Sequence, residues 1–123
     1  MTTTPNTTAQ WLLKTQAVNF RPHEPYTLTS GWRSPVYVDV RRILGDPDAR
    51  RSIVDAAAEG IRSELGDVQA ISGGETAGIP YAALIADRLD LTMSYVRKKP
   101  KGFGRNALIE GEVPTGLRTL LVE

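Results

Sequence analysis

Residues 68–78 decide the fold, because Val68-Gln69-Ala70-Ile71-Ser72 runs directly into Gly73-Gly74-Glu75-Thr76-Ala77-Gly78. The first part has the composition of a short strand, a helix is predicted over 78–89, and another strand is predicted over 92–96. Strand, helix and strand in that order are typical of an α/β unit with a parallel sheet. Ligands bind such sheets beyond the carboxyl ends of the strands, where the glycine-rich turn lies. The buried helix face is expected at four apolar positions: Ile79, Ala83, Ala86 and Leu89.

Flanking elements are predicted on both sides of this unit. Apolar spacing predicts helices over 8–18 and 48–65, and on the second helix Arg51 is expected to pair with Asp55. Further strands are expected over 26–30, 35–41 and 118–122. The 35–41 strand is expected to have two distinct faces, one with Val36, Val38 and Val40 and the other with Tyr37, Asp39 and Arg41.

The composition argues against several classes of function. The chain has 123 residues with 15 Lys and Arg, 14 Asp and Glu, one His, no Cys and a net charge of +1. That length predicts a single domain over 1–123, and the absence of Cys excludes a disulfide scaffold, a Cys-ligated metal and a Cys nucleophile. One His excludes a multi-His metal site. The small net charge argues against nucleic-acid binding by bulk electrostatics.

The N-terminal residues 1–8 are polar and Thr-rich, and they are expected to be disordered. They lack the apolar run of a signal peptide, and no stretch approaches the ~20 apolar residues of a membrane span. The sequence therefore predicts a cytoplasmic protein that makes no contact with a membrane.

Two interpretations fit the turn at 72–78. Glycines between a strand and a helix let backbone N–H groups approach a phosphate, and the helix N-terminus adds a partial positive charge. The same glycines suit a turn with packing duties alone, since the turn has neither the P-loop ending Gly-Lys-Ser/Thr nor G-x-G-x-x-G. Glu75 would repel an anion, so its carboxylate is expected to face a metal ion, a lysine or solvent.

A basic segment follows the strand over 92–96. Five of the nine residues from 97 to 105 are cationic, and glycines flank Phe103. Several positive charges beyond the carboxyl end of a strand suit a substrate with several phosphates, and the glycines suit a flap that closes over it. The alternative is a solvated charge run, but the position directly after a strand favours the functional interpretation.

A third segment, from Thr29 to Tyr37, places small hydroxyls, a glycine and an arginine before a strand, where they suit a planar anionic ring. Taken alone it is an ordinary loop. Taken in order, the three segments resemble the orotate phosphoribosyltransferase family, which makes orotidine monophosphate from orotate and phosphoribosyl diphosphate. The resemblance covers about residues 11–123 and is carried by Tyr26-Thr-Leu-Thr-Ser-Gly-Trp-Arg-Ser-Pro-Val-Tyr-Val-Asp39, Ile71-Ser-Gly-Gly-Glu-Thr-Ala-Gly-Ile-Pro80, Arg97-Lys-Lys-Pro-Lys-Gly-Phe-Gly104 and Asn106-Ala-Leu-Ile-Glu-Gly111.

The resemblance implies a type I phosphoribosyltransferase fold, Rossmann-like and α/β, with an N-terminal extension and a flexible flap. It also implies Mg²⁺ bound with the diphosphate and a homodimer in which the flap reaches the partner's site. The implied diphosphate contacts are the flap cations Arg97, Lys98 and Lys101, and the loop residues Thr76, Ala77 and Gly78. The implied orotate contacts are Ser30, Tyr37 and Val38. Two positions depart from the family: Phe103 stands where a His is frequent, and Thr29 where some members have a Lys.

The family's phosphoribosyl motif is an apolar strand, two acidic residues and a Thr/Gly-rich turn. Thr119-Leu-Leu-Val-Glu123 matches the strand and the first acid, and the second acid and the turn are not among the 123 residues. The resemblance therefore implies a C-terminally incomplete domain in which Glu123 faces the ribose, with little transferase activity of its own. Two alternatives are a catalytically inactive phosphoribosyltransferase-like binding or regulatory module and an unrelated α/β phosphate-binding protein; the three ordered motifs argue against the latter.

Overall fold

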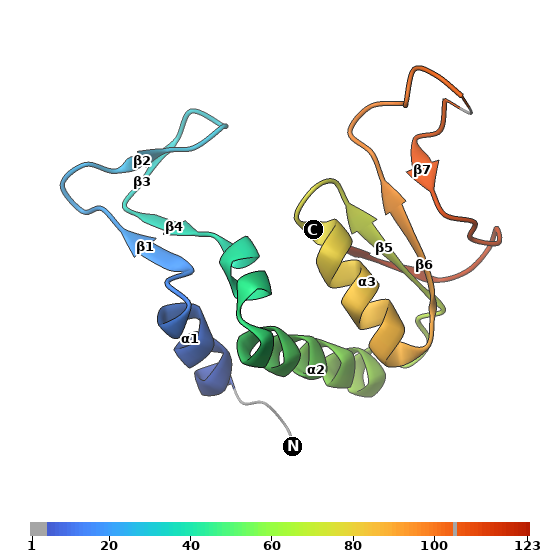
Figure 1. Ribbon diagram of the computed structural model, residues 1–123, viewed down its shortest axis with the longest axis horizontal. Coiled ribbons are helices and arrows are strands. Elements are labelled where there is room, and N and C mark those ends of the chain that lie inside the picture. The colour runs from blue at the N-terminus through green and yellow to red at the C-terminus, as the bar shows by residue number, and fades with distance from the viewer. Residues whose placement is uncertain (1–4, 105) are drawn as a thin grey trace. The chain divides into compact units, whose positions relative to one another are not determined.

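The computed structural model describes residues 5–104 and 106–123 (Figure 1). The chain divides into two compact units, with the boundary between Ile53 and Val54 inside a helix, and the single domain expected over 1–123 stays a prediction. Each unit has its own buried cluster of apolar side chains. None of the helices in this described part of the chain combines the length and the apolar character that a membrane span requires.

The N-terminal unit begins with the helix α1 (Pro5–Lys14). The helix starts inside the stretch that was expected to be disordered, and residues 1–4 lie outside the described residues. Two short antiparallel pairs follow: β1 (Val18–Phe20) with β4 (Val36–Val38), and β2 (Tyr26–Thr27) with β3 (Arg33–Ser34). The core of the unit contains Ala17, Ile43 and Ala49, against which Trp11, Leu12 and Ile53 pack.

The strand predicted over 35–41 is shorter than its alternating pattern suggests. It ends at Val38, and a 3-10 helix, η1 (Val40–Gly45), follows. The cause is local, because the Asp39 side chain accepts a hydrogen bond from the Arg41 backbone N–H at 3.2 Å and caps η1. The valine face is not buried, since Val36 and Val38 are 39% and 48% exposed.

The helix α2 (Pro47–Glu64) links the two units and agrees with the helix predicted over 48–65 to within one residue at each end. Its start is capped by Asp46, whose Oδ1 accepts hydrogen bonds from two backbone N–H groups at 3.0 Å. The predicted pairing of Arg51 with Asp55 is wrong. Arg51 binds Asp48 one turn earlier, and Asp55 binds Arg88 of the next helix at 2.6 Å.

The C-terminal unit contains a four-stranded sheet in the order β7-β6-β5-β8. Its strands are β5 (Ala70–Gly74), β6 (Thr92–Val96), β7 (Ile109–Glu110) and β8 (Thr119–Val122). β5 runs parallel to both β6 and β8, as the strand–helix–strand pattern predicts, whereas β7 runs antiparallel to β6. The bounds predicted for β6 are confirmed, and β5 begins and ends two residues later than predicted.

The helix α3 (Gly78–Leu89) has the predicted bounds and packs against the sheet (Figure 1). Its buried face differs by one position from the prediction, because Ala82 and Ile85 are buried and Ala83 is exposed. The core of this unit joins α2, β5 and α3 through six residues: Val54, Ile61, Ile71, Ala82, Ile85 and Ala86.

Candidate functional site

Three predicted segments meet at the carboxyl edge of the sheet in the C-terminal unit. β5, β6 and β8 are parallel, so Gly74, Val96 and Val122 end on the same side. The residues that follow them are the turn 75–78, the start of the basic segment at Arg97, and Glu123. The fold thus brings together the predicted loop residues, the flap residues Arg97 and Lys98, and Glu123.

Glu75 connects the turn to the basic segment. Its backbone N–H donates to the Val96 carbonyl at 2.9 Å, and its carboxylate Oε2 accepts from the Lys98 backbone N–H at 2.7 Å. The Glu75 carboxylate thus binds a backbone amide of the basic segment, and the residue is exposed to solvent, one of the three surroundings expected for it. The peptide bond between Glu75 and Thr76 is cis.

The glycines of the turn are explained by close packing. A Cβ at Gly73 would lie 2.8 Å from the Gly78 carbonyl oxygen, and a Cβ at Gly78 would overlap the Val122 carbonyl oxygen. A Cβ at Gly74 would contact the Glu123 side chain at 3.2 Å. The packing interpretation of these glycines is therefore sufficient, and any role in anion binding rests on the position of the turn and its neighbouring cations.

The first turn of α3 points toward the same edge. Ala77 occupies the N-cap position and makes no side-chain capping hydrogen bond. An uncapped helix start carries a partial positive charge on its free N–H groups, which favours an anion nearby. Thr76, Ala77 and Gly78 thus occupy the place that an anionic group beyond β5 would approach.

The basic segment forms an arm between β6 and β7. Its two sides are joined by hydrogen bonds from Arg97 N–H to the Leu108 carbonyl at 2.8 Å and from Lys101 N–H to the Ala107 carbonyl at 3.3 Å. The turn at its tip carries Phe103, which is 72% exposed. Arg105, the fifth cation of the segment, lies outside the described residues.

Lys101 is held by an acidic side chain on β7. Its Nζ lies 3.6 Å from Glu110 Oε1, which is buried and makes no hydrogen bond with the described residues. The ammonium group also lies 5.7 Å from the centroid of the Phe103 ring. Unlike Arg97 and Lys98, which the described residues leave without an ion pair, this predicted cation already has a carboxylate partner.

The N-terminal unit contains a separate pocket of about 520 Å³. Ser30 and Tyr37, two of the three residues assigned to orotate, line it, together with Tyr26, Thr27, Leu28 and Thr29. The rings of Tyr26 and Tyr37 lie 5.5 Å apart between centroids. Val38 does not line this pocket, because successive side chains of a strand point to opposite faces and Tyr37 precedes it on β4.

A charged pair stands beside this pocket. Arg41 donates from Nε to Asp39 Oδ1 at 2.7 Å and from Nη2 to the Tyr37 hydroxyl at 3.2 Å. The hydrogen bond from Arg41 lowers the pKa of the Asp39 carboxyl below its ordinary value. The guanidinium thus links the phenol of the pocket to an ionised carboxylate.

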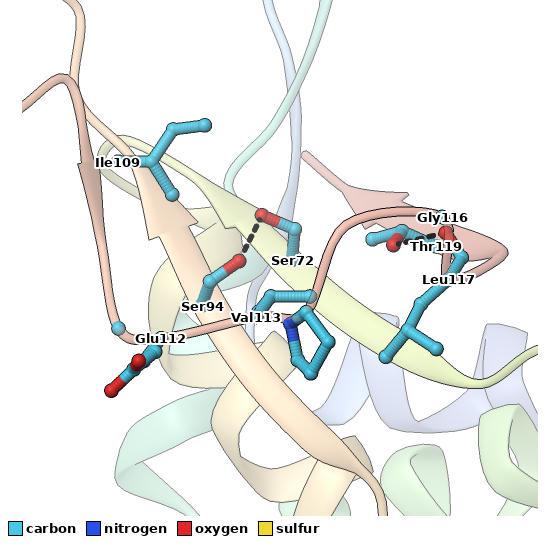
Figure 2. A pocket seen from close by; sticks show the side chains of 10 residues that line it. Ser72, Ser94, Ile109, Glu112, Val113, Gly116, Leu117 and Thr119 are labelled. Atoms are coloured by element: carbon cyan, nitrogen blue, oxygen red, sulfur yellow. Dashed lines mark hydrogen bonds between the residues drawn. The ribbon is translucent and has the colours of Figure 1, made fainter.

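A second cavity in the C-terminal unit, also of about 520 Å³, lies on the face of the sheet (Figure 2). The hydroxyls of Ser72 and Ser94 point toward one another across β5 and β6, and Ser94 donates to Ser72 at 3.0 Å. The segment from Gly111 to Leu117 forms its other side. The single charged residue of the described lining is Glu112, so this cavity does not suit a multiply charged anion.

The chain has close relatives among curated proteins. It is 52% identical over 118 residues to orotate phosphoribosyltransferase of Cereibacter sphaeroides, a match that covers 94% of this chain and 51% of the relative. Over nearly its whole length, the chain is thus similar to proteins named orotate phosphoribosyltransferase. It spans about half the length of the curated relatives that it matches. No protein-family model matches the chain.

Solved structures show the same similarity. UMP synthase of Leishmania donovani superposes with a TM-score of 0.75 at 29% identity, over 93% of this chain and 23% of that protein. Orotate phosphoribosyltransferase of Aeropyrum pernix gives a TM-score of 0.68 at 34% identity, over 87% of this chain and 57% of that protein. The fold is therefore that of the type I phosphoribosyltransferases, as the sequence predicted.

Three contributors to these sites were not assigned from sequence. Tyr26 lines the N-terminal pocket, Arg41 binds Tyr37, and Glu110 binds Lys101. The spacing Tyr37-x-Asp39-x-Arg41 is a signal for the second, because alternate residues of an extended segment share a face. The contact between Lys101 and Glu110 joins the two sides of an arm, so it depends on a register that the sequence does not reveal.

Proposed function

We propose that this chain supplies the diphosphate-binding edge and the orotate-side segment of an orotate phosphoribosyltransferase. The observation that carries the proposal is the meeting of the turn 75–78, Arg97 and Lys98 at one edge of a parallel sheet. The relatives named orotate phosphoribosyltransferase support the substrates, phosphoribosyl diphosphate and orotate. The product would be orotidine monophosphate, an intermediate on the route to UMP.

The residues at this edge suit the stabilisation of a leaving pyrophosphate. Displacement at the ribose anomeric carbon by a ring nitrogen of orotate breaks the bond to pyrophosphate, and negative charge grows on that group. Arg97 and Lys98 have no ion-pair partner among the described residues, so their charge is available to an anion. Lys101 would join them once it leaves Glu110. The reaction requires no nucleophilic side chain.

Mg²⁺ is part of the proposal as an ion that arrives with the diphosphate. The described residues contain no cluster of three or more His, Asp or Glu side chains that could hold a metal ion. Mg²⁺ is commonly held by one or two carboxylates together with substrate phosphates, and Glu123, which forms no ion pair with the described residues, would supply one at this edge. When bound, the ion would neutralise charge on the departing pyrophosphate.

Titration calorimetry with the Mg²⁺ complex of phosphoribosyl diphosphate and with orotate tests the proposal. We expect both ligands to bind, and Lys98→Ala to weaken the diphosphate by at least about tenfold, because a charge-assisted hydrogen bond is lost. Lys99→Ala removes the same charge one residue away and is the matched control, with a smaller loss. Absence of heat with both ligands would contradict the proposal. Binding without formation of orotidine monophosphate would favour the inactive binding module instead.

We also propose a cytoplasmic homodimer. An exposed apolar face on β1 and β4 supports self-association, because Val18 pairs with Val38 and Phe20 pairs with Val36 on the same side of the two strands. Phe20 is 65% exposed. Sedimentation velocity should show a dimer that Phe20→Asp converts to a monomer, while Leu13→Asp, at another exposed apolar position, leaves it intact. A wild-type chain that stays monomeric across concentrations would overturn the dimer.

A further inference from the structure

Glu75 is the acidic residue of the turn that the proposed reaction leaves without a role. A carboxylate beside a diphosphate raises the local negative charge, so its presence there requires a compensating interaction. The structure supplies one in the backbone N–H of Lys98, which donates to Glu75 Oε2 at 2.7 Å. This is a charge-assisted hydrogen bond, stronger than one between neutral groups.

The two hydrogen bonds of Glu75 lie on either side of Arg97. The Glu75 N–H donates to the Val96 carbonyl, which extends the pairing of β5 with β6 by one step beyond Gly74. The Glu75 carboxylate then accepts from the amide of Lys98. A third bond, from Arg97 N–H to the Leu108 carbonyl, holds the same segment against the returning side of the arm. The backbone from Val96 to Lys98 is thus fixed from two directions.

The Glu75 carboxylate accepts a hydrogen bond from a backbone amide and forms no ion pair with the cationic side chains beside it. No described residue forms an ion pair with the Arg97 guanidinium or the Lys98 ammonium group. Had Glu75 paired with either side chain, it would have removed one of the charges that an anion needs. Because the Glu75 carboxylate binds the Lys98 backbone amide, it holds this part of the flap while both side-chain charges stay unpaired.

We propose that Glu75 is a positioning residue that ties the first residues of the flap to the turn 75–78. It directly precedes Thr76, so any displacement of the flap at Lys98 is transmitted to the loop at the start of α3. This tie, the hydrogen bond from the Lys98 amide to the Glu75 carboxylate, is present without a ligand. Its effect on the affinity for the diphosphate rests on the proposed function. Both can be measured separately.

Amide hydrogen exchange of the 123-residue chain, followed by NMR, tests the tie. Three variants separate hydrogen bonding from charge: Glu75→Gln keeps an acceptor without the charge, Glu75→Asp keeps the charge with a shorter reach, and Glu75→Ala removes both. We expect the Lys98 amide to exchange about tenfold faster in the Asp and Ala variants and within about threefold of wild type in the Gln variant. Glu59→Ala, an exposed glutamate of α2, is the control and should change nothing at Lys98.

Amides of β6 that face β5, such as that of the buried Ser94, report whether each variant is folded. Equal exchange of the Lys98 amide in all three variants and wild type would overturn the tie. Equal acceleration in the Gln and Ala variants would show that charge alone matters and would overturn it as well. If Glu75→Ala disturbs the ladder, the comparison of the Gln and Asp variants decides the matter.

The affinity for Mg²⁺–phosphoribosyl diphosphate tests the consequence of the tie. We expect Glu75→Ala to weaken binding several-fold and Glu75→Gln to retain wild-type affinity. If wild type binds and Glu75→Ala binds equally well, Glu75 has no positioning role for the anion. If wild type does not bind, the proposed function fails, and the tie is judged on the exchange rates alone.

Discussion

Gly78 illustrates how one absent methyl group governs the approach of a helix to a sheet. A Cβ at this position would overlap the Val122 carbonyl, whereas a Cβ at Gly60 of α2 meets nothing within 4 Å. Both glycines lie in helices and neither has a positive φ, so their difference is one of surroundings rather than of backbone conformation. They form a matched pair for measuring the cost of that approach.

We expect Gly78→Ala to destabilise the protein by about 1–3 kcal/mol, because α3 must move away from β8. Gly60→Ala is expected to stabilise by about 0.5–1 kcal/mol, since Ala loses less backbone entropy in a helix. Urea denaturation monitored by circular dichroism gives both values. Two changes of the same sign would contradict the packing explanation of Gly78.

Asp39 provides a residue-scale prediction about pH. The hydrogen bond from Arg41 lowers its pKa below the ordinary aspartate value of 3.8. The stabilisation is therefore fully present above pH about 4 and is lost as the pH falls through the lowered pKa. An NMR titration of the Asp39 carboxyl should show a midpoint below 3.8, which Arg41→Ala moves upward. An unchanged midpoint in that variant would exclude Arg41 as the cause.

At the scale of elements, the sequence predicts the parts whose contacts are local. α3 and β6 have the predicted bounds because a 3.6-residue apolar spacing and a short segment that ends in Tyr95 and Val96 need no distant partner to be recognised. The strand over 35–41 was wrong beyond Val38, because a side chain–backbone hydrogen bond at Asp39 competes with the extended conformation. For the candidate site, the sequence likewise predicted the segments but not the contacts between them. The hydrogen bond between Glu75 and Lys98 joins residues that lie close together only once the sheet has formed.

The arm between β6 and β7 supplies a prediction of its own. Removing the Lys101 ammonium group leaves the buried Glu110 Oε1 without its cation, so Lys101→Ala should destabilise by about 1 kcal/mol. Lys99→Ala, which removes an exposed lysine of the same arm, should be close to neutral. Thermal unfolding of the two variants at equal protein concentration makes the comparison. An equal effect of both would show that the pair with Glu110 adds nothing to stability.

At the scale of the whole molecule, the two cores predict that local stability divides at α2. Ile43 is buried in the N-terminal cluster and Ile71 in the C-terminal cluster. Truncating either to Ala should cost about 2–5 kcal/mol. We expect Ile43→Ala to accelerate amide exchange chiefly before residue 54 and Ile71→Ala chiefly after it. Uniform acceleration along the chain in both variants would instead favour the single domain predicted from sequence.

The strand order β7-β6-β5-β8 also sets an order of assembly. The contact between Ser72 of β5 and Ser94 of β6 joins residues 22 positions apart in the sequence. The contact between Gln69 and Arg118, which directly precede β5 and β8, joins residues 49 positions apart. Closing the longer loop costs more chain entropy and follows the local contacts. During synthesis, one flank of β5 therefore waits unpaired until residues 119–122 leave the ribosome. Pauses in translation before that point would prolong the interval in which a nascent chain exposes the unpaired edge of β5 to chaperones or to other chains.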